Sequence, residues 1–466
     1  MRQQLSTLPA DDAGRVLDRL TALEHVIPPE AIQQALRDTG TVDSRRCPLT
    51  HQLMLWVVLA MGLFTDVPIR QVFKRARRLR PEEQAPHRSS LCVARQRLGV
   101  APVQHLFHQT TRLLATPETP GAFYKGLRLM AFDGSIYNVP DSEANALAFG
   151  RSDGGRGPSA RPQVRKVSLV EVGTHVELDL VLKGIGAPDS GEQSMVPALF
   201  HHLQADMLVL WDRGYFSYWL WKSLLQRGVQ ILARVPCGLV LKRIRSLPDG
   251  SYLAKIYPCH SFRNRDRDGI VVRVIRYTLD DPQRVGHAQE HVLLTTLLDA
   301  DAYPALELIL LYHERWEIEL VYDEQKTHQD PKRPSKPANL RSETPLGVLQ
   351  EMYALSLGHF VVRAFMAEAA ATVALDPDRL SFVGCLNILR DRLPECPPGG
   401  AESIAVWCRG LVWEMSRERT DDAVRRNRIN PRVIKQKMSK FKKKRPEHRR
   451  LPPLKKTFTE AVVMLC

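Results

Sequence analysis

The sequence predicts a mixed α/β (α+β) fold, with a helical region at the start of the chain and a sheet after it. Residues 1–120 contain stretches of helical periodicity separated by polar breaks. From about residue 121 the pattern changes to short runs rich in β-branched and aromatic residues, which favour strands. With 466 residues, 44% of them hydrophobic and 25% charged, the chain is long enough for about three globular domains.

The first region, residues 1–120, is expected to be a helical N-terminal domain. Pro28 and Pro29 stand before Glu30, and proline is tolerated in the first turn of a helix. The stretch 89–99 is followed by helix-favouring residues and carries Arg95 and Arg97. The other expected helices are 13–25, 29–38, 50–63, 69–79 and 103–115.

The next region, residues 121–235, is expected to be the first part of a catalytic core. Gly173 and Thr174 separate two strand-like runs and so predict a hairpin turn. Three antiparallel strands followed by a strand, a helix and a strand is the order of a ribonuclease-H-like sheet. The expected strands are 127–132, 164–172, 176–183, 206–212 and 229–235, with a helix over 217–227.

Residues 236–295 interrupt this pattern with a basic, strand-rich insertion. Arg263 and Arg265 belong to a cluster of arginines, so the insertion either contacts a polyanion or only stiffens the fold. Its expected strands are 239–243, 252–257, 269–277 and 290–296. The second part of the core is expected over 296–395, with helices over 345–371 and 381–392. A linker at 394–400 then leads into a C-terminal region, 396–466.

Two aspartates follow apolar strand-like runs. Asp133 comes after the run 128–132, and Asp212 comes after the apolar run 207–211. Open α/β sheets place their active residues at the carboxyl ends of strands. An Asp and a Gly after a strand are also ordinary turn residues, so either aspartate taken alone is better explained as part of a turn.

A helix-like stretch over residues 310–328 adds a third carboxylate. At about 100° per residue, Tyr312, Arg315, Glu319 and Lys326 share an arc of about 60°. The exposed side is expected to hold three other glutamates, at positions 314, 317 and 324. An intrahelical ion pair between Arg315 and Glu319 is the simpler explanation of the charged arc.

Asp133, Asp212 and Glu319 together suggest a metal site. Carboxylates without neighbouring Cys or His ligands suit hard ions such as Mg²⁺ or Mn²⁺ rather than zinc. A site of this composition is typical of two-metal phosphoryl transfer.

The signature Tyr-x2-Arg-x3-Glu-x6-Lys, behind Asp133-Gly-Ser and Asp212-Arg-Gly-Tyr-Phe, resembles the insertion-sequence-four (IS4) family of bacterial DDE transposases. Shorter matches at 27–30, 139–142, 148–150 and 247–250 extend the resemblance over nearly the whole chain. The resemblance implies a ribonuclease-H-like core with a β-strand insertion, and cut-and-paste transposition of an insertion sequence by strand cleavage and strand transfer. It also implies that Asp133, Asp212 and Glu319 are the catalytic residues and hold two Mg²⁺ (or Mn²⁺) ions.

The resemblance further implies that Tyr312, Arg315 and Lys326 bind DNA phosphates. The expected partners are the terminal inverted repeats of the element and the target DNA, with a homodimer acting on paired ends. The helical N-terminal domain either docks on those ends or only packs against the core. Two rival functions stay open: a nuclease of the same fold that cuts without strand transfer, and a non-catalytic DNA-binding protein derived from a transposase.

The charge of the chain is concentrated near its end. The formal net charge is +15, and residues 421–466 hold 15 Lys or Arg against 4 Asp or Glu. A basic block with few apolar residues is expected to be a solvated tail that contacts DNA, with Lys442, Lys443, Lys444 and Arg445 as candidate contacts. The eight cysteines show no zinc spacing, and we expect no signal peptide, no membrane span and a cytoplasmic, nucleoid-associated protein.

Overall fold

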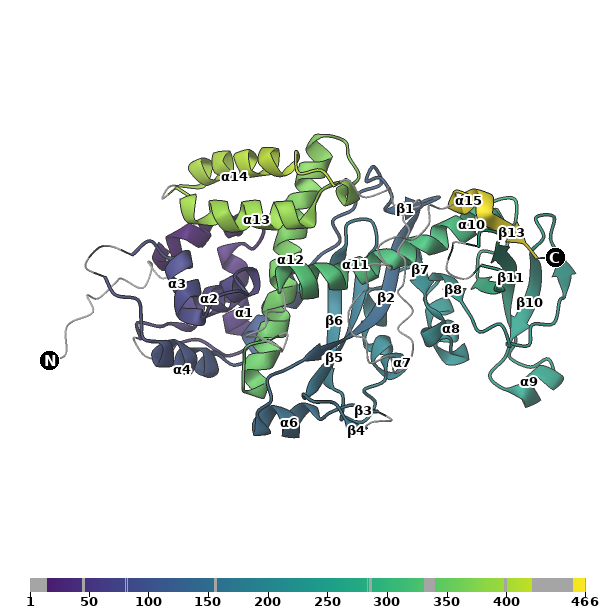
Figure 1. The fold of residues 1–466 in the computed structure, drawn as a ribbon, viewed down its shortest axis with the longest axis horizontal. Helices are drawn as coiled ribbons and strands as arrows, with labels where there is room; N and C mark the ends of the chain where they lie inside the picture. Colours follow the sequence, from purple (N-terminus) through teal and green to yellow (C-terminus); the bar gives the residue numbers. More distant parts are fainter. Residues whose placement is uncertain are drawn as a thin grey trace. The chain divides into compact units, whose positions relative to one another are not determined.

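The computed structural model describes residues 15–43, 47–79, 81, 83–154, 157–282, 284, 287–330, 340–397, 400–420 and 456–465. The chain divides into two compact units (Figure 1). The first unit comprises Met1–Phe123, Asp133–Leu199 and Ile318–Thr420, and the second comprises Tyr124–Phe132, Phe200–Glu317 and Asp421–Cys466. Both units combine helices with strands, which confirms the predicted mixed α/β class.

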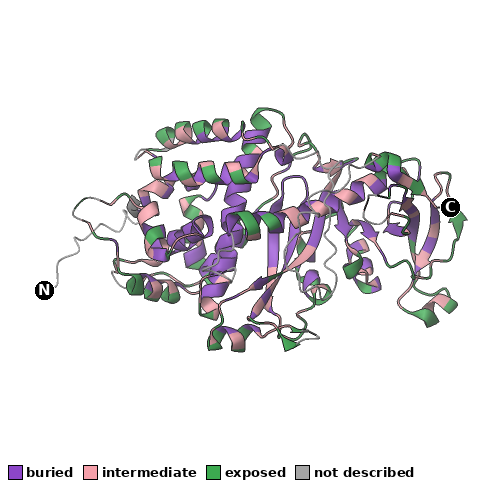
Figure 2. Ribbon diagram, viewed as in Figure 1, coloured by how far each residue is buried: buried purple, intermediate pink, exposed green. Residues whose placement is uncertain are grey.

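The helical core of the first unit is built on α2 (His51–Leu63) and α12 (Pro345–Thr372), which pack against each other. Every residue from Leu53 to Leu63 is buried, as expected for a helix that is apolar on all sides. Figure 2 shows both helices buried over most of their length. Other helices of this unit include η2 (Arg15–His25), α1 (Pro29–Asp38), α3 (Ile69–Ala76), α4 (Arg88–Leu98), α5 (Ala101–Thr110), α6 (Glu143–Phe149), α7 (Glu192–Met195), η7 (Pro377–Arg379), α13 (Phe382–Arg392), η8 (Leu393–Glu395) and α14 (Ala401–Met415).

Strands β5 (Gln163–Glu171) and β6 (Val176–Gly184) of the first unit form the predicted antiparallel hairpin. Strand β2 (Leu127–Asn138) lies beside β5 and contributes its first six residues to the second unit and its last six to the first. A two-stranded ribbon, β3 (Asp153–Gly154) and β4 (Gly157–Pro158), completes the strands described in this unit.

In the second unit, the first half of β2 pairs in parallel with β7 (Met207–Trp211), and β7 pairs in parallel with β8 (Gln230–Arg234). Across the sheet, the neighbouring strands lie in the order β6, β5, β2, β7, β8. Numbered along the chain, these five strands have the sheet order 3-2-1-4-5. That is the order of a ribonuclease-H-like sheet, as predicted. Other elements of the unit include β1 (Phe123–Tyr124), η4 (Arg213–Tyr215), α8 (Tyr218–Leu225), β9 (Arg245–Ser246), β10 (Tyr252–Ile256), α9 (His260–Asn264), β11 (Ile270–Leu279), β12 (His291–Thr295) and α10 (Ala305–Tyr312).

The predicted insertion extends the sheet of the second unit. Strand β12 pairs antiparallel with β8, β11 with β12, and β10 with β11. Residues 239–243, however, form no strand, so that prediction was wrong. Val240 is 51% exposed and Ile244 57% exposed, so this segment lacks the buried face that would hold it in a sheet.

The C-terminal region contains two features that the sequence analysis did not predict. Helix α14 occupies Ala401–Met415, directly after the predicted linker. Residues 457–464, expected to belong to a solvated tail, form α15 (Phe458–Ala461) and β13 (Val462–Met464) instead. Strand β13 pairs antiparallel with β11, and Phe458 is buried. The expectation of a solvated tail was therefore wrong for this segment.

Among the described residues, α12 is the helix long and apolar enough to cross a membrane by length and composition. Its most apolar 18-residue window has a mean hydropathy of 1.2, and 78% of that window is buried inside the protein. Such burial is typical of the core helix of a globular unit.

Substitution Gly62→Ala should destabilise the first unit. A methyl group at Gly62 of α2 would lie 1.8 Å from the backbone oxygen of Ala354 in α12, and neither backbone can move without separating the two helices. Overpacking of this kind costs roughly 1–3 kcal/mol or more. The measurement is the free energy of unfolding from urea denaturation.

The matched control is Gly410→Ala in α14, where an added methyl group meets nothing within 4 Å. That change should stabilise the protein by about 0.5–1 kcal/mol, because alanine loses less backbone entropy in a helix. Equal effects of the two substitutions would contradict the close approach of α2 and α12.

Candidate active site

Asp133 lies in the middle of β2, not at the end of a strand as predicted. The strand continues to Asn138 because its second half belongs to the first unit, where Tyr137 is fully buried. One carboxylate oxygen of Asp133, Oδ1, accepts a hydrogen bond from the backbone N of Gly134 at 2.8 Å. The backbone oxygen of Asp133 accepts a hydrogen bond from the hydroxyl of Tyr322 at 2.6 Å.

Asp212 directly follows β7, as predicted. Its backbone oxygen accepts the N–H of Tyr215, which closes the short 3-10 turn η4. The preceding carbonyl, that of Trp211, accepts a hydrogen bond from the hydroxyl of Tyr312 at 3.2 Å. Tyr312 is 6% exposed, so this hydroxyl is used inside the second unit.

The residues just before the two aspartates are in contact within the second unit. The β2–β7 register pairs Ala131 with Leu210, two residues before each aspartate. The rings of Phe132 and Trp211 follow, with centroids 6.0 Å apart. Phe200 and Tyr215 complete this aromatic cluster around Trp211. The cluster fixes the backbone from which Asp133 and Asp212 project.

The stretch 310–328 is not one regular α-helix. Helix α10 ends at Tyr312, a 3-10 turn (η5, His313–Trp316) follows, then α11 (Glu317–Asp323), and then a π-helical segment (η6, Glu324–Gln329). The 3-10 and π turns advance by different angles per residue from an α-helix, so the assumption of about 100° per residue over the whole stretch was wrong. Tyr312 and Arg315 belong to the second unit, and Glu319 and Lys326 to the first.

The prediction that three glutamates occupy an exposed face was also wrong. Glu314, Glu317 and Glu324 are only 1%, 2% and 7% exposed. The local pattern could not reveal this burial, because the groups that compensate a buried carboxylate come from distant parts of the chain. Glu319, in contrast, is partly exposed, as is Lys326.

Glu324 is surrounded by cationic and imidazole groups within the first unit. Arg363 donates through Nε to Glu324 Oε2 at 3.0 Å, and a second guanidinium nitrogen pairs with Oε1. His359 Nε2 lies 2.8 Å from Oε2, and His175 Nδ1 lies 3.0 Å from Oε1. Burial alone would raise the pKa of Glu324, but Arg363 and the two imidazoles hold it well below its usual range.

Gln325 joins a second buried polar cluster in the first unit. Its Oε1 accepts from Lys166 Nζ at 2.5 Å and from the Tyr137 hydroxyl at 3.1 Å, while its Nε2 donates to Glu177 at 3.0 Å. Lys166 and Glu177 form an ion pair at 2.7 Å and are 0% and 1% exposed. Burial lowers the pKa of Lys166, and the charge of Glu177 opposes that shift.

Lys326 and Gln329 complete the anchoring of the π-helical segment. Lys326 Nζ donates to Ser135 Oγ and to the backbone oxygen of Ile136, both at 2.8 Å. Gln329 Nε2 donates to the backbone oxygens of Gly62 and Leu355 at 2.9 and 2.8 Å. The segment after Glu319 is therefore tied to β2 just beyond Asp133 and to the α2–α12 core.

Tyr322 is a site residue that the sequence analysis missed. It lies three residues after Glu319, on the same face of α11, and its hydroxyl reaches the backbone of Asp133. The helix segment that carries Glu319 is thereby held against the strand that carries Asp133. The spacing of three residues was the signal that could have identified it.

A second missed residue is Glu192, at the start of α7. An added Cβ at Gly134 would lie 2.3–2.6 Å from atoms of the Glu192 side chain, so the glycine leaves room for this carboxylate next to Asp133. The requirement for glycine after Asp133 was visible in the sequence, but its partner was not.

The residues predicted to contact DNA differ in their exposure. Arg315 is 4% exposed, and its guanidinium lies over the ring of Trp316 at 5.1 Å. Arg263, within α9, is half-buried, and Arg265, directly after α9, is exposed. Lys442, Lys443, Lys444 and Arg445 lie outside the described residues. DNA binding by all of these side chains stays a prediction.

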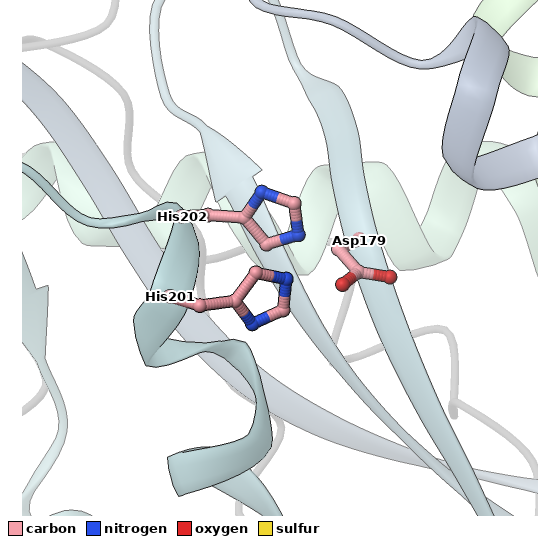
Figure 3. Close-up of side chains that lie close together, drawn as sticks. All are labelled: Asp179, His201 and His202. Carbon is pink, nitrogen blue, oxygen red and sulfur yellow. The ribbon is translucent and has the colours of Figure 1, made fainter.

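Two histidines outside the signature lie side by side. Figure 3 shows His201 and His202 at the end of η3 (Val196–His202), with ring centroids 4.0 Å apart. Asp179, in the same view, lies on β6, where its carboxylate pairs with His108 at 3.1 Å. Asp179 belongs to the first unit and both histidines to the second. None of them is part of the candidate active site.

The donor chemistry around the signature fits a hard divalent ion. Asp133, Asp212, Glu319 and Glu192 offer carboxylate oxygens, which Mg²⁺ and Mn²⁺ prefer. Glu314, Glu317 and Glu324 are buried. Among the glutamates of the stretch 310–328, Glu319 is the partly exposed one and so remains accessible to an ion.

Comparison with known proteins gives consistent matches. A family model described as "Insertion element 4 transposase N-terminal" matches residues 17–108, and one described as "Transposase DDE domain" matches residues 124–341. In solved structures, the chain is similar to a piggyBac transposase synaptic complex with hairpin DNA, with 13% identity and a TM-score of 0.40. That match covers 89% of this chain and 88% of the other.

Two Escherichia coli (strain K12) proteins are similar in sequence. The candidate transposase InsZ is 28% identical over 246 residues, covering 48% of this chain and 79% of InsZ. The transposase InsG of insertion sequence element IS4 is 30% identical over 429 residues, covering 91% of this chain and 93% of InsG. Asp133, Asp212 and Glu319 all lie within the residues matched by the DDE model. The chain therefore belongs to the IS4 family of DDE transposases and functions as a transposase.

Proposed function

We propose that this transposase cuts DNA at the ends of its own element and joins the freed 3′ ends to target DNA, with Asp133, Asp212 and Glu319 as the catalytic carboxylates. One observation carries the proposal: two tyrosines of the signature region each donate to a main-chain carbonyl at, or directly before, an aspartate. Tyr322 donates to the carbonyl of Asp133, and Tyr312 to the carbonyl that precedes Asp212. The signature segment thus fixes the backbone from which both aspartates project.

We propose that Asp133, Asp212 and Glu319 hold two divalent ions, Mg²⁺ or Mn²⁺. When bound, such ions supply positive charge that stabilises the attacking and leaving oxygens of phosphoryl transfer. The side chains of this protein orient the carboxylates before DNA arrives. Tyr322 and the Gly134 N–H hold Asp133, and the Trp211 cluster and Tyr312 hold Asp212.

Arg315 and Lys326 are proposed to contact DNA phosphates beside the carboxylates. Arginine offers a planar fork for a phosphate, whereas lysine offers a point charge. Lys326 is partly exposed while it holds Ser135 and Ile136, so its ammonium group reaches the surface next to β2. Tyr312 has a different role in this proposal, because its buried hydroxyl is used by Trp211.

The proposed partners are the terminal inverted repeats of the element and the target DNA, bound by a homodimer on paired ends in the bacterial cytoplasm. The net charge of +15 supports a polyanionic partner. Arg263 and Arg265 of the insertion and Lys442 to Arg445 of the tail are the proposed phosphate contacts outside the active site. A nuclease that cuts without joining would use the same carboxylates, so only a strand-transfer assay separates the two activities.

Substitutions Asp133→Ala, Asp212→Ala and Glu319→Ala should each abolish cleavage in Mg²⁺ while leaving DNA binding largely intact. Losing one ligand removes several kcal/mol of transition-state stabilisation, by order of magnitude. The measurements are nicking and strand transfer on a fragment that carries the element's end, with and without EDTA, alongside a gel shift.

The matched control is Asp323→Ala, an exposed carboxylate on the same helix as Glu319, which should keep wild-type cleavage. A triad variant that cuts at the wild-type rate would remove that residue from the site. Cleavage without any strand transfer by the wild-type protein would favour the nuclease.

Replacing Lys442, Lys443, Lys444 and Arg445 together by Gln should flatten the salt dependence of DNA binding and preserve the preference for the element's ends. The logarithm of the binding constant falls with the logarithm of salt by about 0.9 for each phosphate contact, so each lost contact lowers the slope by that amount. The measurement is fluorescence anisotropy at several salt concentrations, with end DNA and random DNA.

A charge-preserving variant, with the three lysines replaced by Arg, is the control and should keep the wild-type slope. Point substitution is cleaner here than truncation, because residues 457–464 are packed into the second unit. A loss of end preference in the Gln variant would show that these residues take part in specific recognition.

A further inference from the structure

The segment 457–464 reaches the turn that carries the catalytic signature. Strand β13 pairs with the end of β11 through Tyr277↔Met464, Thr278↔Val463 and Leu279↔Val462. The pairing is extended by the Asp280 N–H, which donates to the backbone oxygen of Ala461 at 2.7 Å. Figure 1 shows α15 and β13 (yellow) beside α10 and β11 of the same unit.

Helix α15 is held in one orientation by a capping box. The Thr457 side chain accepts the backbone N–H of Glu460, and the Glu460 carboxylate accepts the backbone N–H of Thr457. Arg284 Nη2 donates to the backbone oxygen of Lys456 at 2.7 Å. These bonds fix Phe458, the first residue of α15, which is 5% exposed.

Phe458 packs against the signature itself. Its ring meets the imidazole of His313 edge to face, with centroids 3.6 Å apart, and the guanidinium of Arg284 lies over the same ring at 5.5 Å. His313 lies between Tyr312 and Arg315, in the 3-10 turn η5. A contact on His313 therefore bears directly on the placement of Tyr312.

Tyr312 passes the constraint to the catalytic strand. Its hydroxyl donates to the carbonyl of Trp211, the residue before Asp212. Burial, with Arg284 and His291 nearby, lowers the pKa of His313 to about 3, so the imidazole stays neutral at pH 7 and packs as an uncharged ring. The path from Phe458 to Asp212 runs through His313, Tyr312 and Trp211, all within the second unit.

We propose that Phe458 is a positioning residue for Asp212, acting through His313 and Tyr312, and that the segment 457–464 is thereby part of the catalytic machinery. The proposal rests on the proposed function, because it treats Asp212 as a metal ligand. The segment 457–464 thereby gains a structural role beyond the DNA binding that the basic residues before it suggested.

The test compares full-length Phe458→Ala with Phe458→Leu and with Lys456→Ala. Leucine keeps apolar volume against His313, and Lys456→Ala removes an exposed ion pair with Asp280 just before the segment 457–464. Three quantities are measured: hydrogen exchange of peptides covering 207–215 and 308–316, the Mg²⁺ concentration for half-maximal cleavage, and the midpoint of thermal unfolding.

Phe458→Ala should speed exchange in both peptides and raise the half-maximal Mg²⁺ concentration several-fold. Phe458→Leu should recover most of both effects, and Lys456→Ala should match the wild type. Hydrogen exchange does not depend on cleavage, so it tests the effect of Phe458 on residues 207–215 even if the wild-type protein does not cut DNA. Failure of the wild-type protein to cut would count against the proposed function alone.

Faster exchange confined to 456–465, or an unchanged Mg²⁺ requirement in a folded Phe458→Ala protein, would overturn the proposal. If Phe458→Ala does not fold, Phe458→Leu decides. For Phe458→Leu, a slightly raised Mg²⁺ requirement together with faster exchange at 207–215 supports the positioning role of Phe458. Wild-type values of both quantities overturn it.

Discussion

An ionised carboxylate in the interior of the first unit determines which elements of that unit must lie close together. Glu324 is 7% exposed and charged, so it needs compensating groups close by. Those groups come from α12, through Arg363 and His359, and from the β5–β6 turn, through His175. Satisfying one side chain thus brings together a helix, a hairpin and the signature segment.

The neighbouring cluster follows the same principle with a neutral centre. Gln325 donates to one member of the buried Lys166–Glu177 pair and accepts from the other, and it also receives the Tyr137 hydroxyl. Removing a single partner from such a network leaves a buried polar group unsatisfied, which is costly. Several mutually dependent bonds therefore hold the π-helical segment in one arrangement. In the second unit, by contrast, packing of aromatic rings around Trp211 holds β2 and β7 in place.

The sequence was sufficient for features that depend on local chemistry. Apolar runs ending at Asp133 and Asp212 predicted the two strands, and the order of the runs predicted the sheet. Features that depend on distant partners were missed. The π turn, for example, begins at Glu324, whose carboxylate contacts His175 about 150 positions away in the chain, so no periodicity within the segment could reveal it.

Two further misses have the same origin. Strand β13 has three residues, too few for a pattern, and it pairs with residues 277–279 of β11, beyond the residues 270–274 that pair with β10. Helix α14 has Trp413 and Val406 at exposed positions and Gly410 in its interior, so its amphipathic pattern is weak. In both cases the surrounding fold, more than intrinsic propensity, decides the local structure.

The π-helical segment η6 also affects how the chain tolerates insertions and deletions. A π turn accommodates one residue more than the α-helical hydrogen-bond pattern, which bonds each N–H to the carbonyl four residues earlier. Loss of a single codon between Glu319 and Lys326 preserves the reading frame and leaves a sequence able to wind as a regular helix. Lys326 would then shift by one helical position relative to Glu319 and turn away from β2, whereas residues after the π turn would keep their places, because the lost residue is the extra one that the turn accommodates. A deletion that is harmless for local helix formation is thus severe for the site. The Glu-x6-Lys spacing therefore reflects the number of residues between Glu319 and Lys326 rather than their identity.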